Sequence, residues 1–117
     1  MQAPTLESYY ISKPEPYQGC LLALRDIILR VDAEIIHERK FQIPFFIYRG
    51  KKLAYLWLDR KKLKMGFCLD KSLQQPVGDA KPKDQYESIL IDPNKDIPVE
   101  FIRQKLESYI RRIKNSL

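Results

Sequence analysis

The chain has 117 residues, of which 44% are hydrophobic and 31% are charged, and its formal net charge at pH 7 is +6. This length fits one domain with one modest core, and the composition excludes a disordered chain. No apolar run approaches the ~20 residues of a membrane span, and the amino terminus lacks the order of a signal peptide, so we expect a cytoplasmic protein without a membrane partner.

The predicted elements begin with an amino-terminal arm over residues 1–16, where Pro4, Pro14 and Pro16 interrupt regular hydrogen bonding. Residues 9–11 of this arm are compatible with a short helical turn that docks on the body. A helix is predicted over 17–31, because apolar residues recur there at steps of three and four. These residues are Leu21, Leu24, Ile28 and Val31.

A meander of five antiparallel strands is predicted over residues 34–91. Runs rich in aromatic and β-branched residues are separated by turn residues such as Gly50 and the charged segment "DRKK". The predicted strands are 34–41, 44–48, 53–58, 63–69 and 86–91, with a loop over 71–85. In the fourth strand, one face holds Leu63, Met65, Phe67 and Leu69, and the other holds Lys64, Gly66 and Cys68. One face of the sheet is therefore expected to be core and the other wetter.

A closing helix is predicted over 98–116, because Pro98 suits the first helical position. Its apolar stripe contains Val99, Ile102, Leu106, either Tyr109 or Ile110, Ile113 and Leu117. Both helical stripes can be buried on one face of the antiparallel sheet. The predicted fold class is therefore α+β, a single-domain two-layer sandwich of order α-β(5)-α.

Four segments of the chain are similar to those of a known family. They are "YYISKPEPY" at 9–17, "LALRDII" at 22–28, "HERKFQIPFFIYRGKKLAYLWL" at 37–58 and "KLKMGFCLDKSL" at 62–73. On these residues the chain resembles the YdhG-like family of small bacterial domains, mostly of unknown function. The resemblance covers nearly all of residues 1–117 and implies a helix, meander and helix sandwich similar to frataxin.

An iron role is a further implication of this resemblance, because at least one relative is regarded as a frataxin-like intracellular iron chaperone. Iron binding of that type uses carboxylates on the first helix and first strand, since hard iron prefers oxygen ligands. The acidic residues of this chain in those elements are Asp26, Asp32, Glu34 and Glu38. The cations between them are Arg25, Arg30, Arg39 and Lys40. Iron is the one cofactor considered, and only under this alternative.

The segment from 49 to 64 holds seven basic residues and one acidic residue, so it carries the whole net charge. Such a segment can contact phosphates by charge while an aromatic ring stacks on an unpaired base. The candidate ligand-binding residues are Arg49, Lys51, Lys52, Tyr55, Trp57, Arg60, Lys61, Lys62 and Lys64. This hypothesis requires the cations to lie on one surface. The preferred interpretation of the segment is a solvated hairpin whose lysines keep the protein soluble and block edge pairing.

Most aromatic residues of the strands are predicted to form core and cross-strand packing. They are Phe41, Phe45, Phe46, Tyr48, Tyr55, Trp57 and Phe67. However, the second and third strands look apolar on both faces, and helices cover only one of them. The other face is therefore predicted to meet a partner, which is a ligand, another protein or a second copy in a homodimer through the sheet.

No catalytic constellation stands out in the sequence. His37, the sole histidine, is expected to be a half-buried strand residue that points away from the face of Glu38. Cys20 and Cys68 are expected to be reduced, with Cys68 a small buried hydrophobe and a thiolate near Lys64 as the alternative. We expect a non-enzymatic binding or chaperone-like module whose ligand face is the exposed, basic-rimmed side of the sheet. Weak nucleic-acid or polyanion binding is the second alternative, after the iron role.

Overall fold

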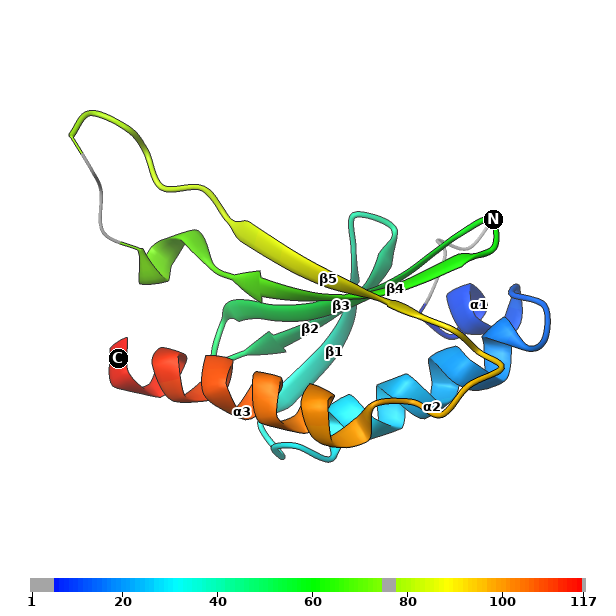
Figure 1. Cartoon of the computed structure of the whole chain (residues 1–117). Helices are drawn as coiled ribbons and strands as arrows, with labels where there is room; N and C mark the ends of the chain where they lie inside the picture. The colour runs from blue at the N-terminus through cyan, green and yellow to red at the C-terminus, as the bar shows by residue number, and fades with distance from the viewer. Residues whose placement is uncertain (1–5, 75–77, 117) are drawn as a thin grey trace.

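An open five-stranded antiparallel sheet lies against three helices in the computed structural model, which describes residues 6–74 and 78–116 (Figure 1). The helices are α1 (Leu6–Ile11), α2 (Tyr17–Leu29) and α3 (Val99–Ser116). The strands are β1 (Ile35–Lys40), β2 (Ile43–Tyr48), β3 (Lys51–Asp59), β4 (Lys62–Leu69) and β5 (Gln85–Ile91), and a 3-10 turn η1 (Lys71–Leu73) follows β4. Residues 1–5 of the predicted arm, residues 75–77 of the predicted loop and Leu117 of the predicted stripe lie outside the described residues.

The predicted α+β class and the antiparallel meander are confirmed, since the strands pair in the order β1-β2-β3-β4-β5. The predicted element order, α-β(5)-α, is not confirmed, because the helical turn expected at 9–11 is a complete short helix, α1, ahead of α2. Such a short helix is not stable by propensity alone. Tertiary packing stabilises it instead, because Tyr9 and Tyr10 are buried in the core.

The core lies between the sheet and the helices, which all lie on the same side of the sheet (Figure 1). Its fully buried members from the helices are Leu21, Leu24, Ile28, Ile102 and Leu106, and those from the sheet are Phe46, Tyr48, Leu56, Met65 and Phe67. In α3, Ile110 is buried and Tyr109 packs beside it against Phe67, whereas Val99, predicted in the stripe, is exposed. We call the opposite side of the sheet the open face, because no described helix covers it.

A bulge in β3 sets which of its side chains reach the open face. Phe46 pairs with Ala54, while the next residue of β2, Ile47, pairs with Lys52, so Leu53 is the extra residue. Leu53 and Ala54 are consequently both buried in the core. The alternation resumes beyond the bulge and places Tyr55 and Trp57 on the open face. None of the described helices is long and apolar enough to cross a membrane.

Leu106→Ala should lower the free energy of unfolding by about 2–5 kcal/mol, because the side chain is fully buried beneath the sheet. Urea unfolding followed by circular dichroism measures this change. The matched control is Leu90→Ala, which truncates a leucine that is 68% exposed on β5 and should cost less than about 0.5 kcal/mol. Equal losses in the two variants would contradict the assignment of the two faces.

Candidate ligand-binding groove

A row of aromatic rings crosses the open face from the β1–β2 turn to β5. The ring centroids of Phe41 and Phe45 are 5.7 Å apart, those of Phe45 and Tyr55 are 5.6 Å apart, and those of Tyr55 and Tyr86 are 5.8 Å apart. Strand pairing explains the row, since Phe45 lies opposite Tyr55 and both belong to the outward set of their strands. Trp57 lies two residues beyond Tyr55 on the same face.

Gly66 of β4 makes room for this row. It lies directly opposite Tyr55, and the phenol ring lies over its Cα. A Cβ atom at position 66 would come within 1.8 Å of Tyr55 Cε1, so any other residue would displace the ring. The absence of a side chain at Gly66 therefore lets the ring of Tyr55 lie flat against the sheet, where the ring adds to a continuous aromatic surface.

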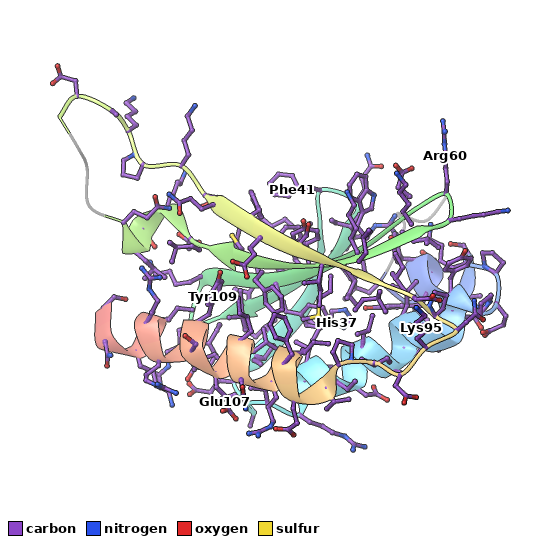
Figure 2. The ribbon with its side chains drawn as sticks, in the orientation of Figure 1. His37, Phe41, Arg60, Lys95, Glu107 and Tyr109 are labelled. Carbon is purple, nitrogen blue, oxygen red and sulfur yellow. The ribbon has the colours of Figure 1, made fainter. Side chains whose placement is uncertain are left out.

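The turn that presents Phe41 is strained. Phe41 and Gln42 have φ angles of 52° and 66°, in the left-handed region that asparagine and glycine usually occupy in a two-residue turn. Phe41 is also 69% exposed, so it gains little from burial in return. Two predictions for Phe41 are wrong, since it lies outside β1 and not at the end of the first strand, and it is exposed and not part of the core. Backbone strain of this kind is concentrated at functional sites. Figure 2 shows the ring standing clear of the sheet on the open side.

These rings line a shallow hollow of about 360 Å³, which we call the aromatic groove. Its lining residues are Phe41, Ile43, Phe45, Tyr55, Trp57 and Tyr86. Tyr86 is 51% exposed and Trp57 is 38% exposed, while Phe45 forms the buried floor. Burial raises the pKa of both Tyr55 and Tyr86, so their hydroxyl groups stay protonated at neutral pH. The groove is thus an uncharged, largely apolar surface open to solvent.

One cation of the predicted set lies at the groove. Lys64 pairs with Trp57 across β3 and β4, and its Nζ atom lies 5.4 Å from the centroid of the Trp57 ring. This contact holds the ammonium group over the face of the indole. The structure therefore brings together three of the predicted ligand-binding residues: Tyr55, Trp57 and Lys64.

The other predicted cations divide between the two ends of β3. Arg49, Lys51 and Lys52 lie at the β2–β3 end, and Arg60, Lys61 and Lys62 lie at the β3–β4 turn. A nine-residue strand separates these ends by roughly 25–30 Å. Arg60 extends away from the body of the protein (Figure 2). The predicted cations therefore form two groups at opposite ends of β3 and not one cluster.

Two cations at the β2–β3 end are held by carboxylates. Arg49 Nη2 lies 3.0 Å from Glu34 Oε2, and Lys52 Nζ lies 2.7 Å from Asp84 Oδ2. Burial raises the pKa of Asp84, but hydrogen bonds from Lys52 and the Lys71 backbone outweigh this effect and hold the pKa below its usual value. Lys52 therefore fastens the segment before β5 to β3, which is a structural role.

The carboxylates of the iron alternative are not gathered in one cluster. Asp26 is paired with Arg25 at 3.2 Å, Glu34 is engaged by Arg49, and Asp32 accepts a hydrogen bond from the Glu34 backbone at 2.8 Å. Glu38 lies on the exposed edge strand β1. Among residues 6–74 and 78–116, no group of three metal-ligating side chains is placed to hold an ion.

His37 and the two cysteines have the structural roles expected of them. Tyr10 Oη lies 2.8 Å from His37 Nε2, and the imidazole stacks on Phe46 at 4.5 Å between ring centroids. Figure 2 places His37 beneath the sheet, on the helix side. Cys20 and Cys68 are both free and buried. Burial, with a smaller effect of Asp84, raises the pKa of Cys68 to about 12, so the thiolate alternative is wrong.

Sequence patterns missed the exposed position of Phe41 and the contribution of Tyr86. Neither residue carries a local signal, because the groove is assembled from β2, β3, β5 and a turn that are brought together by pairing. Comparison of the chain with protein-family models, with curated proteins and with solved structures finds no match. The assignment of a function therefore depends on the geometry described above.

The stability of the protein should fall as the pH decreases from about 6.5 towards 4, in part because of His37. Burial, assisted by Arg25, lowers the pKa of this residue from 6.5 to about 4, so the unfolded chain takes up a proton in this range and the folded chain does not. This difference should cost about 2 kcal/mol at pH 4.5. Urea unfolding across this range measures it. His37→Gln retains a hydrogen-bonding group without titrating, so its unfolding free energy should depend less steeply on pH. Equal pH dependence in the two proteins would contradict this prediction.

Proposed function

We propose that this chain is a small non-enzymatic binding module whose ligand site is the aromatic groove on the open face of the sheet. The observation that carries the proposal is the row of contacting rings on a face without a described helix. Large exposed apolar side chains on one face typically mark a binding surface. Besides Phe41, Trp57 and Tyr86, the open face exposes Ile36 and Leu90, at 56% and 68%.

The strained turn supports the same proposal. Holding a phenylalanine in the left-handed region costs roughly 1–2 kcal/mol, and the exposed ring of Phe41 recovers little of this by packing. A turn selected only for stability would carry asparagine or glycine at these positions. The strain is explained if the ring is presented to a ligand.

The chemistry of the lining favours binding over catalysis. The groove is lined by rings and one isoleucine, with no histidine, thiol or carboxylate among its described residues. Such a surface recognises flat, unsaturated groups by stacking and by displacement of water. The resemblance to YdhG-like domains remains a prediction and is compatible with a binding or chaperone-like module.

The neutral planar dye Nile red tests the groove without involving charge. We expect saturable binding to the folded protein together with quenching of Trp57, the sole tryptophan, which lies in the groove. Phe41→Asn should weaken binding by about tenfold, since one aromatic contact is lost, and should leave stability within about 1 kcal/mol because asparagine tolerates the turn.

Gln42→Asn is the matched control for this variant. It introduces the same residue into the same turn but leaves the Phe41 ring in place, so dye affinity should be unchanged. Equal affinity of the wild type and Phe41→Asn would contradict the proposal. Sedimentation equilibrium accompanies the titration, because a wild-type dimer dissociated by Phe41→Asn would make a second copy of the chain the occupant of the open face.

A further inference from the structure

We infer that the aromatic groove binds a base of single-stranded nucleic acid, and that a neighbouring cleft containing Lys13 and Arg39 binds the adjoining phosphate. This inference rests on the proposed function, because it names the ligand class of the aromatic groove, which the cleft adjoins at the end of the sheet beside α1. Neither cation belongs to the basic segment from 49 to 64 that the sequence singles out.

The cleft lies where α1 and the residue that follows its turn, Lys13, meet the first hairpin and the end of β3. Its volume is about 540 Å³. Its lining residues are Ser8, Tyr9, Ser12, Lys13, Arg39, Phe41, Gln42, Ile43, Trp57 and Leu58. Two cations therefore line this cleft, and its described lining includes no carboxylate. That combination suits a phosphate, which accepts hydrogen bonds from charged donors.

A single buried ring holds both cations at the cleft. Lys13 Nζ lies 4.3 Å from the centroid of Tyr9, and Arg39 Cζ lies 5.7 Å from the same centroid. Arg39 Nη1 also reaches Ser8 Oγ at 3.5 Å. The two cations come from separate elements, and the fold brings both to the same ring. Both therefore contribute positive charge to the cleft.

Tyr9 itself is fixed in place. Its side chain is 6% exposed, and its hydroxyl oxygen accepts a hydrogen bond from the backbone N–H of Leu58 at 3.1 Å. The ring therefore joins α1 to the end of β3, next to Trp57. Cations anchored in this way lose less side-chain entropy on binding than mobile surface lysines do.

The cleft and the aromatic groove share Phe41, Ile43 and Trp57. A ligand that places a flat ring on Phe41 or Trp57 can thus place an anionic group beside Lys13. A nucleotide has this combination of groups. Because the rings form a row, they can stack successive bases, and Lys64 over Trp57 supplies a further cation along the path. A strand with unpaired bases therefore fits better than a lipid or a polyanion without aromatic groups, which offers no planar ring.

Fluorescence anisotropy of a labelled oligodeoxythymidine of about ten nucleotides, titrated with the full chain between about 50 and 200 mM salt, tests this inference. We expect salt-dependent binding together with quenching of Trp57. The double variant Lys13→Gln with Arg39→Gln should lower affinity by about tenfold and reduce the slope of log K against log salt by about 0.7, because one phosphate is no longer neutralised. Its affinity for Nile red should not change.

The matched control removes two exposed cations from the distant end of α3, as Arg112→Gln with Lys114→Gln. It lowers the net charge equally but should change the affinity for the oligonucleotide by less than about twofold. Lys13→Glu alone should weaken binding at least as much as the neutral double variant. If the control and the cleft variant lose equal affinity for the oligonucleotide, net charge alone explains the binding, and the inference is overturned.

Three competitors distinguish the ligand class. Unlabelled oligonucleotide should displace the probe, thymidine monophosphate should do so only at much higher concentration, and polyphosphate or polyglutamate should displace it without quenching Trp57 and less effectively per charge. Polyanions that compete as well as the oligonucleotide would overturn the role of the base. If Nile red binds the groove and the oligonucleotide does not bind at all, this inference fails while the proposed function stands. If neither binds, both fail.

Discussion

The fold depends on one constraint: within residues 6–74 and 78–116, the helices cover only one face of the sheet. Their apolar stripes and the inward residues of the strands close a core that includes Phe46, Leu56 and Phe67. The central strands nevertheless carry apolar residues in both directions, as Phe45 beside Phe46 and Trp57 beside Leu56. The apolar residues that do not point into the core have to lie on the opposite side, because alternate residues of a strand point to opposite faces. The open aromatic face is thus a direct consequence of one-sided coverage.

This open face is organised rather than simply left uncovered. Gly66 accommodates the ring of Tyr55, and Lys64 lies over Trp57. The bulge in β3 turns Leu53 inward, so the strand regains the parity that sends Tyr55 outward. Each of these features preserves a continuous row of rings, which a surface under no functional constraint would not need. The exposed left-handed turn at Phe41 agrees with this view, because it lowers stability without contributing to the core.

The basic residues of the protein have different surroundings at the two ends of β3. At one end of β3, Arg49 and Lys52 are paired with Glu34 and Asp84 and hold loops in place. At the other end, Lys13 and Arg39 gather on the ring of Tyr9 beside the groove. Runs of lysine in a sequence therefore do not reveal which cations are held by carboxylates, because only the fold brings carboxylates such as Asp84 to distant cations.

The sequence by itself determined the α+β class, the meander, the two long helices and the apolar surplus of the central strands, because these depend on local periodicity and turn residues. Tyr55, Trp57 and Lys64 belong to the basic segment that the sequence singles out, and the pairing of β3 with β4 brings them together. Only the tertiary structure decided that α1 is a helix, that Phe41 is exposed, and that Lys13 and Arg39 meet at Tyr9. These features depend on contacts between residues far apart in the chain, and such contacts have no periodic signature in the sequence.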